Sequence, residues 1–103
     1  MANLTKAFGS VSVVIPVYNA EREVASTLDE VQGYLECSGV PHEIFVVADG
    51  NTDRTADIVR LRGRGVQLLC NETNRGKGFS VRRGMMASKM AWALFMDVDH
   101  STR

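Results

Sequence analysis

Cysteine is scarce in this chain: its 103 residues include two, Cys37 and Cys70. The two do not form a CxxC pair, and no histidine stands at the spacing of a metal site. This pattern excludes a disulfide scaffold and a zinc finger, and it is typical of proteins in a reducing cytosol. We expect both cysteines to be small, buried, apolar side chains.

An excess of charge of one sign is also missing, because twelve Lys and Arg residues balance twelve Asp and Glu residues. Binding to nucleic acid or to an anionic membrane by charge alone is therefore not expected. The longest apolar runs, 13–17 and 90–96, are roughly a third of the ~20 residues that a membrane-spanning helix needs. Residues 1–10 have no apolar core and do not resemble a signal peptide. We expect a cytoplasmic protein, peripheral to a membrane only as part of a longer parent.

What the chain does have is a regular alternation of short apolar runs and amphipathic stretches. Its length and its 45% apolar and 23% charged residues fit one small soluble domain. The apolar runs 11–15, 43–48, 66–70 and 91–96 predict four strands. The first and the last are nearly continuous, which is typical of strands covered on both faces. We expect Pro16 to end the first strand.

Three amphipathic stretches between these strands predict helices over residues 21–36, from about 53 to 62, and from about 78 to 89 or 90. Asn19 is the expected N-cap of the first helix, and Gly39 its end. We expect Arg82 and Arg83 on the solvent face of the third helix. The residues expected to face the core are Val24, Leu28, Val31 and Leu35, then Ala56, Val59 and Leu61, then Met85, Met86 and Met90.

Alternating strands and helices predict an α/β fold of parallel βαβ units with right-handed crossovers. We expect a tail over residues 1–10 and one half-sheet domain over residues 11–103, with the strand order 3-2-1-4. Ligands of such sheets bind beyond the carboxyl ends of the strands, at the point where the strand order reverses. The loops that follow the strands are therefore the places to look for a site.

Asp97 and Asp99 form a D-x-D pair directly after the last strand. Two carboxylates at the end of a buried strand repel each other unless a cation or hydrogen-bond donors meet them. Hard oxygen ligands at this spacing suit Mg²⁺ or Mn²⁺. A solvated turn is the alternative, and the residues alone leave both open. His42 and His100 look like surface residues, with His100 as a less favoured extra ligand.

Residues 74–78, NRGKG, place Lys77 between two glycines at the start of a helix, where backbone N–H groups favour an anion. The segment is neither a Walker A loop nor a dinucleotide fingerprint. A helix start that uses glycine for a tight turn is the alternative. Asp49, at the end of the second strand, suits a ribose hydroxyl or a base N–H, or caps its own turn. Tyr18 offers a face for stacking on a base, or is a partly buried aromatic residue.

Together these segments resemble inverting glycosyltransferases of family 2. VSVVIPVYNA is similar to that family's VSVVIPxYNE, and EIFVVADGNTDRT to its EIIVVDDGSTDxT. NETNRGKGFSVRRGMMAS resembles xxNxGKGxAVRxGxxxA, and ALFMDVDHST resembles xLFMDADLST. Four motifs in the right order, over residues 11–102, are far more specific than any one of them. The GKG loop with the closing D-x-D-x-S-T favours the polyprenyl- or dolichyl-phosphate glucosyl- or mannosyltransferase branch.

The resemblance implies the amino-terminal, nucleotide-binding half of a GT-A fold, which is Rossmann-like. The implied activity binds a nucleotide-diphosphate sugar, of UDP-glucose or GDP-mannose type, and transfers the sugar to an acceptor such as a polyprenyl phosphate. Pro16 and Tyr18 would flank the base and Asp49 would pair with it. Asp97 and Asp99 would hold the divalent ion (Mg²⁺ or Mn²⁺) that bridges the diphosphate, with Asp99 the surer ligand. Lys77 matches the lysine of the GKG loop and, like Asp97, would contact the nucleotide sugar.

Several positions depart from the family pattern. Ala48 replaces the first acid of DDG, and Ala20 replaces the glutamate of YNE, for which Glu21 comes one place late. His100 replaces a leucine, and Arg103 stands where proline is common.

The family's domain continues beyond the D-x-D, so the catalytic base and the acceptor site are expected beyond Arg103. A fragment, or a short protein that needs a partner, would fit. Alternatives are a non-catalytic nucleotide-sugar-binding or assembly module and, less well matched, a receiver-like phosphate-binding domain. An exposed fourth strand predicts self-association.

Overall fold

The computed structural model describes residues 9–63 and 65–98. Residues 1–8 of the predicted tail, and Asp99 and His100 of the last motif, lie outside the described residues. Strands and helices alternate along the chain as predicted. The elements are β1 (Val11–Val17), α2 (Val24–Ser38), β2 (His42–Asp49), α3 (Thr55–Arg62), β3 (Val66–Asn71), α4 (Lys77–Ala87) and β4 (Trp92–Phe95).

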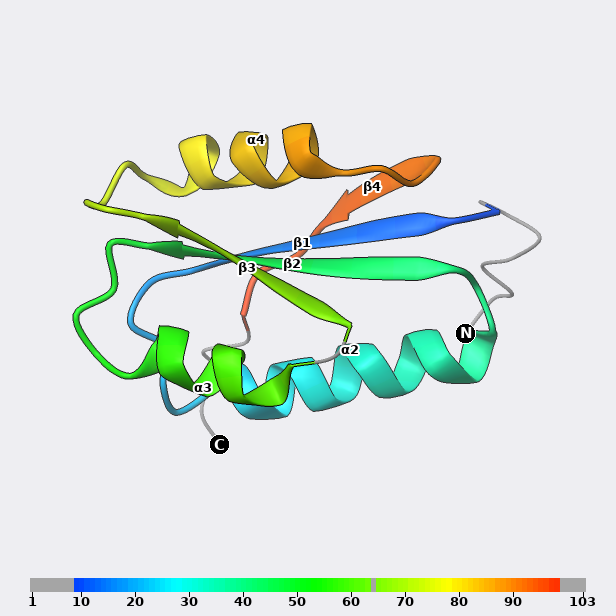
Figure 1. Ribbon diagram of the computed structural model, residues 1–103, viewed down its shortest axis with the longest axis horizontal. Coiled ribbons are helices and arrows are strands. Elements are labelled where there is room, and N and C mark those ends of the chain that lie inside the picture. Colours follow the sequence, from blue (N-terminus) through cyan, green and yellow to red (C-terminus); the bar gives the residue numbers. More distant parts are fainter. Residues whose placement is uncertain (1–8, 64, 99–103) are drawn as a thin grey trace.

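The strands form one parallel sheet in the order β3-β2-β1-β4, which confirms the predicted order (Figure 1). In the register, Val11 pairs with His42 of β2 on one side and with Trp92 of β4 on the other. At the far end of β2, Asp49 pairs with Asn71 of β3. The carboxyl ends of β2 and β3 therefore meet at one place.

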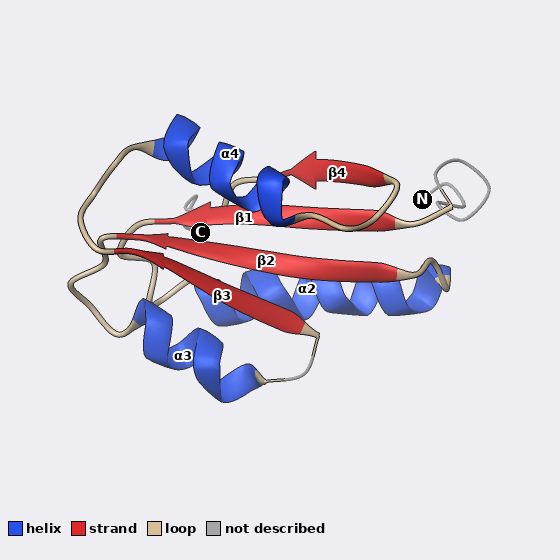
Figure 2. Ribbon diagram, turned by 45° about the horizontal axis from the view of Figure 1, so that its top comes forward, coloured by secondary structure: helices blue, strands red, loops and turns tan. Residues whose placement is uncertain are grey.

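Helices cover both faces of the sheet, α2 and α3 on one face and α4 on the other (Figures 1 and 2). Successive side chains of a strand point to opposite faces. Accordingly, the alternate residues Val11, Val13, Ile15 and Val17 join the core under α2. Helix α2 contributes the four predicted side chains to this core, all of them buried: Val24, Leu28, Val31 and Leu35.

Helix α4 packs on the other face through small side chains. Ser80 and Gly84, one turn apart, are its buried residues. A Cβ atom on Gly84 would lie 2.3 Å from Cγ1 of Val14, so only glycine permits this close approach to β1. The expectation that Met85 and Met86 face the core is wrong, because Met85 is 37% and Met86 79% exposed.

Two expectations about the strands are also wrong. Pro16 does not end β1, since it continues the strand and pairs with Val47. Its nitrogen faces the side of β4, which ends at Phe95, so no ladder hydrogen bond is lost. Strand β4 is not buried but forms an exposed edge, where Trp92 is 52% exposed.

Helix α2 begins at Val24 and not at residue 21, and Asn19 is not its cap. The helix ends as predicted at Gly39, whose left-handed φ of 73° allows its N–H to bond the last carbonyls. Leu61 was expected in the core of α3 but is 82% exposed, while Val59 is buried as predicted. The cysteines, Cys37 and Cys70, are both exposed, which corrects the expectation of burial.

Within residues 9–63 and 65–98, none of the helices combines the length and the apolar character that crossing a bilayer requires.

Candidate functional site

A pocket of about 310 Å³ lies at the carboxyl ends of the strands, on the side of α4. We call it the strand-end pocket. It contains the five described residues to which the sequence assigned nucleotide-sugar binding: Pro16, Tyr18, Asp49, Lys77 and Asp97. The remaining lining residues are Val17, Asn74, Gly76 and Ser80. Segments from three strand ends and the start of α4 therefore converge on one cavity, of the size that ligand sites have.

Asp49 is the most constrained side chain of this pocket and is 4% exposed. Its Oδ1 accepts from the backbone N–H of Arg75 (2.7 Å) and from Asn71 Nδ2 (2.8 Å), and its Oδ2 accepts from the N–H of Gly76 (2.9 Å). Burial alone would raise the pKa of this carboxyl. The three hydrogen bonds outweigh burial and hold the pKa below its usual value. Asp49 is therefore an anion that organises the loop before α4.

Asn71 and Ser80 were not among the predicted site residues, yet they complete this network. Both are buried, and Asn71 Nδ2 donates to Ser80 Oγ at 2.9 Å as well as to Asp49. Arg83 donates to Asn71 Oδ1 and to the carbonyl of Cys70, both at 2.7 Å, so it packs on the end of β3. No local sequence signal marks this network, because it depends on the register that pairs Asp49 with Asn71.

The loop between β3 and α4 approaches the end of β2 closely at Gly50. A Cβ atom there would lie 2.4 Å from the backbone nitrogen of Asn74, and the φ of Gly50 is +70°. Only glycine combines this conformation with this contact. The turn after β2 and the loop after β3 are therefore interlocked where they border the strand-end pocket.

The loop after β1, which carries Tyr18, is held by side chains of the loop after β2. Asn19 has a left-handed backbone (φ 49°), and its Oδ1 accepts from the N–H of Thr52 at 2.8 Å. In return, Asn51 Oδ1 accepts from the N–H of Asn19 at 2.7 Å, and Thr55 Oγ1 accepts from that of Ala20 at 2.9 Å. These reciprocal bonds explain why Asn19 does not cap α2.

Asp53 holds the start of α3 from the position before its N-cap residue, Arg54. Its Oδ1 accepts from the backbone N–H of Thr55 at 3.0 Å, and its Oδ2 accepts from that of Glu21 at 3.2 Å. Burial would raise the pKa of the Asp53 carboxyl, but the bonds from Thr55 and Glu21 lower it on balance. The ionised Asp53 therefore connects the loop after β1 to the start of α3.

Lys77 and Asp97 form an ion pair in the lining of the strand-end pocket, with Lys77 Nζ 2.8 Å from Asp97 Oδ2. Both side chains are 57% exposed, so the pair is solvated and can be exchanged for other partners. Among the described residues, no group of three or more His, Cys, Asp or Glu gathers at one place. One carboxylate together with substrate phosphates nevertheless suits Mg²⁺ or Mn²⁺, so the Asp97 oxygens fit such an ion.

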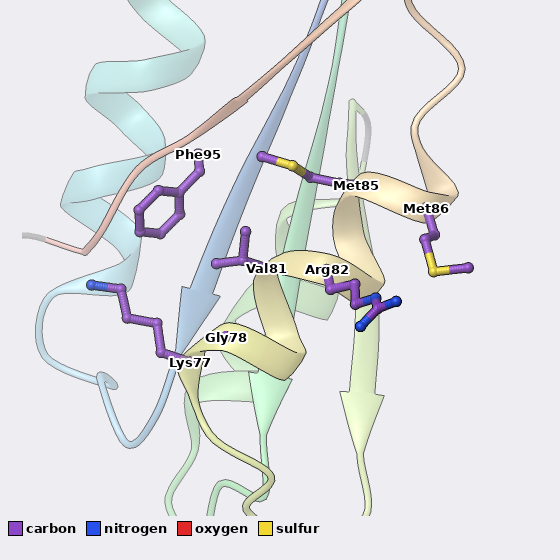
Figure 3. A pocket seen from close by; sticks show the side chains of 7 residues that line it. All are labelled: Lys77, Gly78, Val81, Arg82, Met85, Met86 and Phe95. Atoms are coloured by element: carbon purple, nitrogen blue, oxygen red, sulfur yellow. The ribbon is translucent and has the colours of Figure 1, made fainter.

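A second, apolar groove of about 630 Å³ lies between α4 and the exposed strand β4. Figure 3 shows Phe95 of β4 facing Val81 and Met85 of α4 across it. Lys77 reaches from the first turn of α4 toward Phe95, and its Nζ lies 5.0 Å from the ring centroid. Lys77 thus borders both the strand-end pocket and this groove.

Comparison with known families finds that residues 12–102 match the family described as "Glycosyl transferase family 2". The chain belongs to glycosyl transferase family 2. It is 36% identical over 102 residues to the dolichyl-phosphate beta-glucosyltransferase of Drosophila melanogaster. That alignment covers 89% of this chain and 31% of the fly protein, so the chain spans about a third of this relative.

Solved structures of other glycosyltransferases share the fold of this family 2 chain. Mannosyl-3-phosphoglycerate synthase from Rubrobacter xylanophilus superposes with a TM-score of 0.79 at 24% identity, over 98% of this chain and 34% of that one. Glucosyl-3-phosphoglycerate synthase from Mycobacterium tuberculosis, in complex with Mn²⁺, UDP and phosphoglyceric acid, gives 0.73 at 27% identity, over 94% and 35%. The predicted half-sheet of the GT-A fold is thereby confirmed.

Proposed function

We propose that the strand-end pocket binds the nucleotide of a nucleotide-diphosphate sugar, and that this chain is the donor-binding part of a glycosyltransferase. The observation that carries this proposal is the convergence of Pro16, Tyr18, Asp49, Lys77 and Asp97 on one cavity. These residues come from motifs far apart in the sequence. A fold without a ligand at this place has no need to bring a solvated lysine, a carboxylate and an exposed tyrosine together.

Each side chain has a chemically distinct part in the proposed complex. Tyr18 is 50% exposed, so its ring is free to stack on a base. Asp49 Oδ2 accepts one hydrogen bond in the described structure and has capacity for one more, from a base N–H. Lys77 would exchange Asp97 for a phosphate oxygen, since both partners of this ion pair are solvated. The pocket thus offers contacts for the base at one end and for the diphosphate at the other.

A divalent cation, Mg²⁺ or Mn²⁺, completes the proposed site, with Asp97 and Asp99 as its protein ligands. Such an ion neutralises the charge that develops on the departing diphosphate. The M. tuberculosis neighbour was solved with Mn²⁺ and UDP, which supports a metal and a uridine nucleotide here. Lys77 adds a second positive charge beside the same phosphates.

For the acceptor we propose a polyprenyl phosphate of the dolichyl phosphate type, because the fly relative is a dolichyl-phosphate glucosyltransferase. A phosphate monoester is largely ionised at neutral pH, so as a nucleophile it has little need of a strong general base. UDP-glucose is accordingly the donor that we would test first, with GDP-mannose as the second.

Calorimetry with UDP-glucose and GDP-mannose, with and without Mn²⁺, tests the proposal. We expect Mn²⁺ to strengthen binding to the wild type, and Asp99→Asn to remove most of that metal-dependent gain, about tenfold or more (~1.4 kcal/mol). Asp97→Asn should have the next largest effect. Asp57→Asn changes an exposed aspartate on α3 and serves as the matched control. Equal metal dependence in the wild type and in Asp99→Asn would contradict the assignment.

The exposed edge of β4 supports self-association of this chain as a further part of the proposal. Leu94 is 38% and Phe95 40% exposed, beside strand N–H and C=O groups that face no neighbouring strand in the described part of the sheet. A second copy that pairs its own β4 in this place would cover both. Light scattering should then report a dimer, and Leu94→Lys should shift it to monomer. A monodisperse wild-type monomer would refute the dimer.

A further inference from the structure

Asn71 is the last residue of β3 and is 7% exposed, although β3 is an edge strand with several half-exposed side chains. Its register partner is Asp49, the last residue of β2. Adjacent residues in register point their side chains to the same face of a sheet. The topology therefore places an amide next to the carboxylate that borders the strand-end pocket.

Both N–H donors of the Asn71 side chain are used in hydrogen bonds. Its Nδ2 has two N–H donors, and these bond Asp49 Oδ1 (2.8 Å) and Ser80 Oγ (2.9 Å). Its Oδ1 accepts from Arg83 at 2.7 Å. An acceptor on one side and a guanidinium on the other define which way the amide points. Asn71 consequently has no N–H left for a ligand, and any effect it has on the pocket acts through its neighbours.

Those neighbours form the wall of the pocket. The Asp49 carboxylate bonds the backbone N–H groups of Arg75 and Gly76, the two residues before Lys77. Ser80 lies one turn into α4 and also lines the pocket. Asn71 thereby connects the carboxylate proposed to read the base with the helix that starts at Lys77.

We propose that Asn71 is a positioning residue of the donor site: it holds the Asp49 carboxylate and the start of α4 in the arrangement that binds the nucleotide, without contacting the nucleotide. This inference rests on the proposed function. It means that the nucleotide affinity of the pocket depends on an amide donor that lies behind the pocket wall.

Asn71→Asp tests this idea with an almost isosteric change. The variant puts two carboxyl groups at hydrogen-bond distance, with Arg83 and Arg75 as the nearby cations. Two carboxylates that share a site keep one proton to a higher pH than either alone. At low pH the shared proton restores a donor toward Asp49, as the amide does. At high pH the pair is doubly ionised and the donor is lost.

We would measure the dissociation constant of UDP, and in parallel of GDP, with Mg²⁺ at pH 5 and pH 8, as the ratio of variant to wild type. Because variant and wild type bind the same nucleotide, the effect of the nucleotide's own ionisation on the dissociation constant cancels in this ratio. For Asn71→Asp we expect this ratio to rise by about tenfold or more between pH 5 and pH 8. Gln67→Glu adds the same charge to an exposed position of β3, and its ratio should stay constant. A ratio for Asn71→Asp close to one at both pH values would overturn the proposal.

Amide NMR spectra without nucleotide separate this inference from the proposed function. In Asn71→Asp, the signals of Arg75 and Gly76 should depart from wild-type positions at pH 8 and return toward them at pH 5. Unchanged signals at pH 8 would also overturn the positioning role. Failure of the wild type to bind UDP or GDP would refute the proposed function, while these signals still decide whether Asn71 holds the loop. If Asn71→Asp does not fold, Asn71→Ala must give a loss of about tenfold at both pH values for the proposal to stand.

Discussion

The two faces of the sheet are held to their helices by different means. Under α2 and α3, the buried side chains of β1 and β2 that form the core are apolar, and Leu28 and Ile15 are fully buried there. On the face of α4, the sheet also buries the apolar side chains Val14, Phe45 and Val47, but the helix meets them with its small residues Ser80 and Gly84, and polar groups bond at the margin. Ser12 Oγ donates to Glu43 Oε2 at 2.5 Å and accepts from Ser88 at 2.7 Å.

This difference separates stability from binding. A face packed with large apolar side chains is close-packed and leaves no room for a polar ligand. Helix α4 contributes only small buried residues, so it lies close to β1 while its first turn stays open to the strand-end pocket. We therefore expect substitutions on the α2 face to change stability alone, and those at the carboxyl end of the α4 face to change binding as well.

The largest effect on stability should come from the α2 face. Leu28→Ala removes a fully buried side chain and leaves a cavity, so the free energy of unfolding should fall by about 2–5 kcal/mol. Urea denaturation measures this loss. Met86→Ala, at a 79% exposed position of α4, is the control and should change stability by less than about 0.5 kcal/mol. Equal losses in the two variants would abolish the contrast between the faces.

The next effect concerns Asp49 and depends on pH. Its pKa is lowered in the folded state, so the folded protein binds fewer protons here than the unfolded chain. The stability that this carboxylate contributes is present above its unfolded pKa and is lost as the pH falls through the lower folded value. Asp49→Asn should therefore cost about 1–3 kcal/mol near pH 7, and its difference from the wild type should shrink below a pH of about 3.8.

Urea denaturation at pH 7, 5 and 3 follows that difference. Asp57→Asn, at an exposed aspartate, is the matched control and should differ little from the wild type at any of these values. A difference between Asp49→Asn and the wild type that is constant down to pH 3 would mean that the ionisation of Asp49 adds nothing to stability.

The smallest predicted effects are those of two glycine-to-alanine substitutions, which should change stability in opposite directions on the two faces. Gly84→Ala places a methyl group against Val14, and its overpacking cost of about 1–3 kcal/mol exceeds the gain in helix propensity of about 1 kcal/mol. Gly33→Ala lies in α2 with no atom within 4 Å of the new Cβ, so it should stabilise the chain by up to about 1 kcal/mol. Thermal unfolding of both variants measures the pair. Stabilisation by both would show that α4 has room to move away from β1.

Local patterns were sufficient for the layout of the chain. The number of strands, their alternation with helices, the core residues of α2 and the turn at Gly39 followed from periodicity and glycine positions. The sheet order, also confirmed, was chosen because it places a switch point between the first and fourth strands. Five of the six proposed contacts lie in one pocket because residues at the ends of parallel strands converge whatever the details of packing. Asp99 lies outside the described residues, so its place stays a prediction.

Periodicity was misleading where the distance between elements decides the outcome. A methionine stripe in α4 suggested a core face, but the helix approaches β1 through Gly84 and turns Met86 to the surface. The apolar run of β4 suggested burial, yet its place at the edge of the sheet leaves Trp92 half exposed. Apolar character alone does not say which neighbour a side chain has.

By itself, then, the sequence determined the βαβ order and the loops in which the site lies, because both depend on residues close together along the chain. Only the tertiary structure decided that Asn71 stands behind Asp49 and that the two hold the loop before Lys77. These contacts join residues 22 and 26 positions apart. They arise from the register of β2 against β3, which packing across the whole sheet selects and which no local pattern encodes.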